Sequence, residues 1–462
     1  MSVFSQEKVS SFLPKDKQPK DVFTVVNESD KKTTLFFIDK KSLKATQFDE
    51  NLRLIDSLKI TFPKNEVDDI IGYSYSNNQY FIYWNGLNSK EIVAQCFDFG
   101  TKKTTSQPIN FDIGKEKIVN TLTVNNVFYI ITVLKNSSIL NFYRFIDGRQ
   151  EKKEVDCSDM KFLTTNKMVS FWEMYDEKSG MVYHNGIKNI SSETPPSLVL
   201  STNKKKTYVN GNKLIFTFDV NESFTQMLTV DLSDFTPSQK AYPKPVIIKG
   251  DFDIIDSNSF FINNLLMQIK TSGKLLYLSV KDLEGNEIKN ITLKADMPVD
   301  FKNSEIIQEN GSIKDQRVLD KSNQLIRKIN NLNPSISGYY DGNYNLVIGG
   351  VSFPQQNSVM VGAMLGGLTG ALIASAISSN YSIDNLNSYR NKKVVYIYST
   401  FDKNFNHIDG DSKKSAFDKL RLFVEDNNNN FASPTIFKFG SKLYFGGYDK
   451  RIQQYSFYKF EE

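Results

Sequence analysis

Runs of strand-forming residues return at nearly constant spacing, and this recurrence limits the fold more than any other feature of the chain. Their spacing averages about 46 residues, which is the length of one four-stranded propeller blade. Clusters of Asn, Asp, Gly, Ser and Lys separate the runs, as hairpin turns would. The runs, rich in Phe, Tyr, Ile, Val and Leu, are centred near Phe36, Phe81, Tyr129, Phe171, Phe216 and Leu266.

Further strand signals follow at Tyr344–Gly350, Lys393–Thr400 and Pro434–Phe460. We therefore predict an all-β fold, a β-propeller with seven blades as the favoured count and six or eight as alternatives. The segment near Val22–Val26 is expected to complete the last blade and close the ring, which removes free strand edges. Two β-sandwiches do not require a common period, and a β-helix has much shorter repeats. No propeller signature motif is present, so the prediction depends on spacing and strand pattern.

Composition excludes several classes of site. The chain has 462 residues, two His, two Cys and a net charge of +5. Two His and two Cys are too few for a Cys-rich zinc module, an iron–sulfur site or a disulfide scaffold. Cys96 and Cys157 either pair or stay free. The run Lys204–Lys206 is predicted to be a solvated turn, and the absence of a basic stripe argues against nucleic-acid binding.

No catalytic constellation stands out in the sequence. There is no nucleophile elbow, no phosphate-binding loop and no dinucleotide fingerprint. Asp341 begins a calcium-loop-like run, but Leu346 replaces the required glycine, so we interpret the run as a hairpin turn. His184 and His407 lie in turn-like contexts and are expected to be solvated. We predict no enzyme activity, no catalytic or metal-binding residue and no cofactor.

The period breaks between about residues 300 and 391, where two segments do not resemble blade strands. Apolar residues in 314–332 recur with helical spacing, from Val318 to Leu332, and Asn333-Pro334 follows them. We predict an amphipathic helix there, either joining two blades or docking a partner.

The second segment, 359–377, is a run of 19 residues without charge. Small residues recur at every fourth position, which on a helix makes one flat stripe that another backbone can approach. We name 357–382 the apolar finger and predict that it binds a partner. The candidate contact residues are Met360, Gly362, Met364, Leu365, Gly366, Leu368, Gly370, Leu372, Ile373 and Ala374.

Three interpretations of the apolar finger are open. A membrane span would place two halves of one blade on opposite sides of the bilayer. A core helix packed on the propeller is a purely structural alternative. Helices inserted into hairpin loops are usually amphipathic, however, whereas this segment is apolar all round. We favour a protruding loop whose apolar tip enters a partner's lumen or a membrane surface, because such a surface needs a stable partner.

The first 20 residues lack an apolar targeting region, so they are either a flexible N-terminus or the remnant of a signal peptide. Val3 and Ser5 fit the positions before a signal-peptidase cut ahead of Gln6. A remnant predicts a periplasmic protein, and an N-terminus complete as given predicts a cytoplasmic one. The rest of the chain, 21–462, is predicted to be a single propeller domain with both segments as insertions.

A propeller rich in Lys, Asn and Phe, a signal-peptide-like N-terminus and the apolar finger together resemble the periplasmic plug subunit of the type 9 secretion translocon. The resemblance implies a non-enzymatic protein that docks on a large outer-membrane translocon barrel and closes its periplasmic opening. Membrane contact is then expected only through the partner or the apolar finger. The alternative is an exported propeller that binds or hydrolyses a glycan through carboxylates in its channel.

Overall fold

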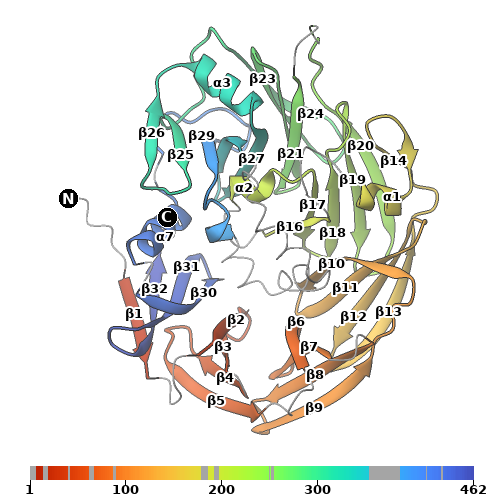
Figure 1. The fold of residues 1–462 in the computed structure, drawn as a ribbon, viewed down its shortest axis with the longest axis vertical. Helices are drawn as coiled ribbons and strands as arrows, with labels where there is room; N and C mark the ends of the chain where they lie inside the picture. The colour runs from red at the N-terminus through yellow and green to blue at the C-terminus, as the bar shows by residue number, and fades with distance from the viewer. Residues whose placement is uncertain are drawn as a thin grey trace.

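The structure, a computed structural model, describes residues 7–13, 19–39, 42–61, 67–86, 90–177, 186–191, 197–248, 250, 254–352, 385–412, 414–427 and 430–461. These residues form seven sheets of four or five strands and one two-stranded sheet. Figure 1 shows the seven sheets arranged around a ring. The predicted all-β propeller with seven blades is therefore confirmed.

The first three blades are antiparallel meanders whose strands follow one another along the chain. Their strands are β2 (Asp21–Asn27), β3 (Lys32–Ile38), β4 (Ser42–Phe48) and β5 (Leu54–Thr61); β6 (Val67–Ser76), β7 (Gln79–Gly86), β8 (Glu91–Asp98) and β9 (Lys103–Asn110); and β10 (Glu116–Val124), β11 (Val127–Leu134), β12 (Ile139–Ile146) and β13 (Arg149–Asp156).

The fourth and fifth blades follow an intervening segment with a two-stranded hairpin and two short helices. That segment contains β14 (Phe162–Leu163), β15 (Met168–Val169), α1 (Phe171–Asp176) and α2 (Leu198–Ser201). The two blades comprise β16 (Lys188–Ile190), β17 (Lys205–Asn210), β18 (Lys213–Phe218), β19 (Phe224–Asp231) and β20 (Pro237–Pro243); and β21 (Asp256–Ile262), β22 (Leu265–Thr271), β23 (Leu275–Lys281) and β24 (Glu287–Lys294). β16 pairs with β17 in parallel.

The sixth blade has the strand order β26-β25-β29-β28-β27, and the seventh has the order β1-β32-β31-β30. Helix α3 precedes β27, and helix α7 precedes β30. The elements are β25 (Ile306–Asn310), β26 (Gln316–Leu319), α3 (Ser322–Asn330), β27 (Asn333–Tyr340), β28 (Tyr344–Val351), β29 (Lys393–Phe401), α7 (Ala416–Asp426), β30 (Phe431–Phe439), β31 (Lys442–Asp449), β32 (Gln454–Phe460) and β1 (Glu7–Phe12).

Paired asparagines set the tight turns between the first two strands of several blades. Asn77 and Asn78 both have positive φ, and so do Asn125 and Asn126 and the pair Asn263–Asn264. Asn tolerates this left-handed region, and two successive positive φ angles match the twist of a hairpin. The polar turn clusters of the sequence therefore carry a specific backbone conformation.

Ring closure uses a different strand from the one predicted. β1 pairs antiparallel with β32, whereas β2 pairs with β3 in the first blade. The predicted closing segment Val22–Val26 thus begins the first blade, and residues 7–12 of the predicted flexible N-terminus complete the last one. Phe12 stacks among Phe37, Tyr455 and Phe457, and burial of these rings favours this closure.

The run centred on Phe171 is a helix, so its prediction as a blade strand is wrong. Ser170 caps α1: its hydroxyl accepts from the backbone N–H of Glu173, and the Glu173 side chain accepts from the Ser170 backbone. This capping box fixes a helical turn and overrides the strand preference of the aromatic residues. The insertion between β13 and β17 therefore has nearly the length of one blade without forming one.

The predicted helix over 314–332 is also only partly correct. Its first part, Gln316–Leu319, is strand β26, which pairs with β25, and α3 begins at Ser322. Leu325, Ile326 and Ile329 lie on the buried face of α3, as the helical spacing indicated. Free edge groups on β25 favour pairing with β26, and this tertiary contact limits the helix to nine residues.

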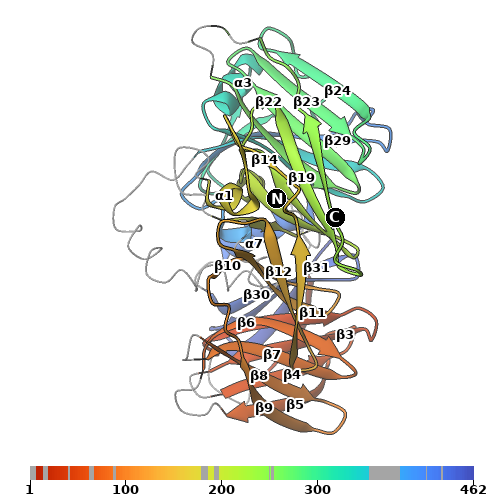
Figure 2. The same cartoon turned by 90° about the vertical axis from the view of Figure 1, so that its right-hand side faces the viewer.

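One end of the ring gathers the non-strand segments. We call it the loop face: the end at which strands β17, β21, β27 and β30 begin. Helices α2, α3 and α7 each precede one of those strands, and residues 254–255 lead directly into β21. In Figure 2, α1 and α3 lie along the left-hand side of the ring.

Strands β28 and β29 lie on either side of the apolar finger in the sequence. They pair antiparallel, with Val351 opposite Val394 on the loop face. Residues 353–384, which include the apolar finger, lie outside the described residues. Within the residues that are described, no helix is long and apolar enough to cross a membrane.

Candidate functional site

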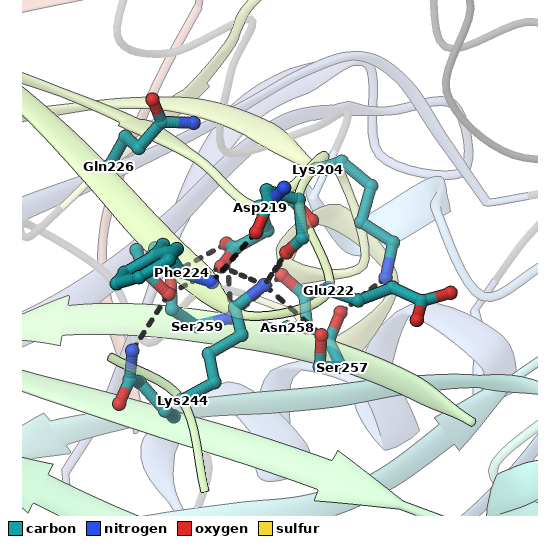
Figure 3. Close-up of polar contacts among 12 residues, drawn as sticks. Lys204, Asp219, Glu222, Phe224, Gln226, Lys244, Ser257, Asn258 and Ser259 are labelled. Atoms are coloured by element: carbon teal, nitrogen blue, oxygen red, sulfur yellow. Dashed lines mark hydrogen bonds and ion pairs between the residues drawn. The ribbon is translucent and has the colours of Figure 1, made fainter. Parts of the chain in front are cut away.

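A buried cluster of charged residues lies between the fourth and fifth blades at the loop face. We name it the lysine cluster: Lys206 on β17, Asp219 directly after β18, and Lys244 directly after β20. The side chains of all three are fully buried. Lys206 Nζ lies 3.1 Å from Asp219 Oδ2, and Lys244 Nζ lies 3.3 Å from Asp219 Oδ1. One carboxylate thus faces two ammonium groups. Figure 3 shows the Lys244 side chain reaching toward Asp219.

Lys206 donates hydrogen bonds to three separate segments of the chain. Its Nζ donates to the backbone carbonyl of Asn203 at 2.6 Å, to Asp219 at 3.1 Å and to Asn258 Oδ1 at 2.7 Å. An ammonium has three N–H donors, so all of them have an acceptor within the protein. Lys206 therefore ties the start of β17 to the start of β21.

Lys244 makes a comparable set of contacts from the other side of Asp219. Its Nζ donates to the carbonyl of Asn221 at 2.8 Å and to Ser257 Oγ at 3.0 Å, with a longer contact to the Asp219 carbonyl. These bonds tie residues 219–221, the segment between β18 and β19, to β21. A fully satisfied buried network holds its loops in one geometry.

Two hydroxyl groups complete the shell around Asp219. Ser259 Oγ donates to Oδ2 at 2.6 Å, and Thr225 Oγ1 donates to Oδ1 at 2.7 Å. Burial alone raises the pKa of Asp219, but Lys206, Lys244 and these hydroxyls outweigh it and hold that pKa below its usual range. Burial lowers the pKa of Lys244 to about 8, against the opposing attraction of Asp219.

Partly exposed groups lie over the lysine cluster. Lys204 Nζ lies 2.7 Å from Asp256 Oδ1 and also donates to the carbonyl of Ser257. The side chains of Lys204 and Asp256 are 13% and 30% exposed, and Glu222 is exposed in the loop after Asn221. Figure 3 shows Lys204 and Glu222 on the same side of the cluster. Two carboxylates and an ammonium are therefore presented on a rigid base.

The prediction of a solvated turn at Lys204–Lys206 is wrong. Lys205 and Lys206 begin β17, are buried, and point to opposite sides of it. Lys205 Nζ donates to the carbonyls of Tyr175 and Glu177, next to the end of α1. The counter-charge comes from Asp219, which is separated in sequence, so the basic run alone gives no sign of burial.

A second buried ion pair lies between the sixth blade and α7. Arg421 on α7 makes a two-pronged contact with Glu309 on β25, at 2.8 and 3.3 Å. Tyr396 donates to the same carboxylate at 2.5 Å, and the Arg421 guanidinium lies 3.8 Å from the ring centre of Tyr389. Here one cation matches one anion.

The other residues singled out in the sequence lie in turns or are buried in the propeller. His407 contacts Asn303 Oδ1 at 3.0 Å and is partly buried, so the expected solvation is incomplete. Asp341 accepts from the backbone of Asn343 in the turn between β27 and β28, which confirms the hairpin. Cys96 and Cys157 are buried free thiols. His184 lies outside the described residues.

The predicted partner-binding residues, from Met360 to Ala374, also lie outside the described residues. Within the described part of the chain, no group of three or more His, Cys, Asp or Glu side chains is placed to hold a metal ion. Sequence reasoning missed Asp219, Lys244 and Asn258. The one local signal was an acidic residue at the end of the apolar run Leu214–Phe218.

Comparison with known proteins finds no matching family model and no curated relative. Among solved structures, an oligogalacturonate lyase in complex with manganese aligns over 100% of this chain and 99% of its own, at 8% identity and a TM-score of 0.36. A protein from Lactobacillus plantarum aligns over 74% of this chain and 82% of its own, at 8% identity and a TM-score of 0.28.

A mutant of the Synechocystis apocarotenoid oxygenase aligns over 57% of this chain, at 10% identity and a TM-score of 0.28. The present chain spans only 58% of the length of that oxygenase. The prediction that the protein is not an enzyme is contradicted by these comparisons, because the lyase and the oxygenase are both named as enzymes. These likenesses concern the fold and transfer no activity.

Proposed function

We propose that this protein binds a glycan at its loop face and hydrolyses it through two carboxylates, Asp256 and Glu222. The observation that carries the proposal is the lysine cluster, whose buried bonds hold both carboxylate-bearing segments in place. Glycan recognition uses carboxylates and ammonium groups as partners for sugar hydroxyls, and hydrolysis uses a pair of carboxylates. Next to the lysine cluster, the carboxylates of Asp256 and Glu222 and the ammonium of Lys204 supply both kinds of group.

The roles of the two carboxylates follow from their surroundings. Asp256 Oδ1 lies 2.7 Å from Lys204 Nζ, and its side chain is 30% exposed. Glu222 is exposed, and its own backbone carbonyl accepts a hydrogen bond from Lys270 at 3.0 Å. We assign Glu222 the proton donor to the leaving oxygen, and Asp256 the base or nucleophile on the opposite side of the sugar.

The test is a panel of neutral and acidic polysaccharides, with reducing ends measured for cleavage and retardation in glycan-containing gels for binding. Wild-type protein is expected to retain and cleave at least one glycan. Glu222→Gln and Asp256→Asn are expected to lower cleavage at least 100-fold while gel retardation persists.

Glu284→Gln is the matched control, because Glu284 is exposed in the turn between β23 and β24 at the opposite end of the ring. It is expected to keep wild-type activity. Absence of both binding and cleavage across the panel contradicts the proposal. Unchanged cleavage in both site variants contradicts the assignment of the carboxylates.

A second proposal is docking on a large membrane protein complex through the apolar finger. The observation in its favour is that β28 and β29, the strands on either side of this stretch of sequence, pair directly, with Val351 opposite Val394. Deletion of 357–382 with a short Gly/Ser linker is expected to preserve the propeller and abolish capture of the complex. Capture that survives the deletion contradicts this proposal.

A further inference from the structure

Three aliphatic residues between β20 and β21, which we call the aliphatic segment, are exposed at the loop face. Val246, Ile248 and Ile254 are 82%, 92% and 64% exposed. Lys244 fixes the start of this segment through its buried bonds to the carbonyl of Asn221 and to Ser257 Oγ. Three bare aliphatic side chains are costly in water unless an apolar phase covers them.

A group of cations without opposing charge lies on the same face. We name Arg317, Arg327, Lys328 and Lys393 the basic patch. Burial, and then repulsion from the other three cations, lowers the pKa of Lys328. Within the described residues, no carboxylate forms an ion pair with any member of the patch, and Arg317 donates to the neutral Gln308 at 2.9 Å.

The topology places both features at one end of the ring. Arg327 and Lys328 occupy the last turn of α3, which leads into the start of β27, and Lys393 begins β29. The aliphatic segment leads into the start of β21. Figure 2 shows α3 on the left-hand side of the ring, the side of the loop face.

We propose that the loop face binds directly to the surface of an anionic lipid bilayer. The basic patch contacts the lipid head groups, and Val246, Ile248 and Ile254 enter the boundary between head groups and acyl chains. The charge complementarity argues for this occupant, since unpaired Lys and Arg side chains gain binding free energy from anionic lipids. Exposed aliphatic side chains on the same face as such cations are typical of proteins that lie on a membrane.

The contact uses other side chains than the proposed glycan chemistry, although both lie on the loop face. Neither the patch nor the aliphatic segment contributes a group to the pair formed by Asp256 and Glu222. Bilayer binding also differs from docking through the apolar finger, because it uses residues of the propeller itself.

The experiment is co-sedimentation of the full chain with vesicles of phosphatidylcholine alone or with 30% phosphatidylglycerol, an amount chosen to be about that of anionic membranes. Wild-type protein is expected to bind the anionic vesicles and to lose binding as salt is raised. Arg327→Gln/Lys328→Gln/Lys393→Gln is expected to bind about 100-fold more weakly. Val246→Ser/Ile248→Ser is expected to weaken binding about tenfold.

The matched control is Lys213→Gln/Lys403→Gln/Lys438→Gln, which removes three exposed lysines from the opposite end of the ring. It is expected to bind like wild type, and circular dichroism checks that every variant is folded. Equal binding of the patch variant and the wild type overturns the proposal. Equal binding to neutral and anionic vesicles, or pelleting without vesicles through self-association, also overturns it.

Discussion

Two buried ionic clusters on this propeller compensate the desolvation of their charges in different ways. Arg421 and Glu309 form a balanced pair, bonded at two points and lined by tyrosines. The lysine cluster is unbalanced, with one carboxylate for two fully buried ammonium groups, and backbone carbonyls and neutral side chains supply the other acceptors. The balanced pair joins two elements, whereas the unbalanced cluster joins several loop segments.

The difference indicates what each cluster contributes. A balanced pair is replaceable by apolar residues of similar volume, since its attraction roughly offsets its desolvation. An unbalanced cluster is not replaceable in this way, because loss of its one anion leaves two buried cations without a counter-charge. We therefore expect the lysine cluster to be more sensitive to single substitutions, and the next experiments test that contrast.

The largest effect is expected for Asp219→Asn. The variant leaves Lys206 and Lys244 buried without a counter-charge, and we expect it to lower the free energy of unfolding by about 5 kcal/mol. Urea denaturation measures the change. The exposed Asp300→Asn is the control and is expected to stay within about 0.5 kcal/mol of wild type. A loss below about 1 kcal/mol for Asp219→Asn contradicts the central role of this carboxylate.

Arg421→Met is expected to lower the free energy of unfolding by less, about 3 kcal/mol. It leaves only one buried charge, that of Glu309, without a counter-charge, and Glu309 keeps its hydrogen bond from Tyr396. The double variant Arg421→Met/Glu309→Leu is expected to recover most of that loss. Urea denaturation of both single variants and the double variant completes the cycle. Additive losses in the double variant contradict the view that this pair is replaceable.

Acid conditions separate the clusters further. The folded pKa of Asp219 lies below its usual value of 3.8, so its contribution to stability is present above that value and is lost as pH falls below it. We expect the stability of wild-type protein to fall more steeply than that of Asp219→Asn between about pH 4 and pH 2. Parallel curves for the two proteins contradict this assignment.

Alkaline conditions have the opposite sign for Lys244. Its folded pKa of about 8 lies below the usual 10.5, so the unfolded chain holds more protons between these pH values. This group alone makes unfolding less favourable as pH rises through that window. The free energy of unfolding of wild type is expected to rise relative to Lys244→Met from pH 8 to pH 10. A constant difference refutes this expectation.

The smallest effect on stability is expected for Lys204→Gln. Its ion pair with Asp256 is partly exposed and screened, so we expect a loss of about 1 kcal/mol or less. The same change is expected to weaken glycan binding severalfold, since it removes an ammonium from the site. A stability loss as large as that of Asp219→Asn would place Lys204 in the buried network rather than above it.

Local patterns in the sequence were sufficient for the blade strands. Runs of apolar residues and polar turn clusters, such as the one that contains Asn77 and Asn78, predicted hairpins that the structure contains. The same patterns failed at Phe171, where the Ser170–Glu173 capping box forms a helix. They also failed at Gln316–Leu319, where pairing with β25 makes a strand.

The candidate site was beyond local reasoning, because its parts come from separated segments. Lys206, Asp219, Lys244 and Ser259 span much of two blades, and no residue type or spacing marks them as partners. Ring closure by residues 7–12 was missed for the same reason, since β1 and β32 lie at opposite ends of the chain.

The sequence by itself determined the propeller, because strand period and turn residues act over a few positions and repeat about every 46 residues. Only the tertiary structure decided which lysines are buried, since burial of an ammonium depends on acceptors brought from distant segments. A basic run that looks solvated in the sequence thus becomes the fixed base of the candidate site. Asp219 makes that possible by supplying the one buried negative charge.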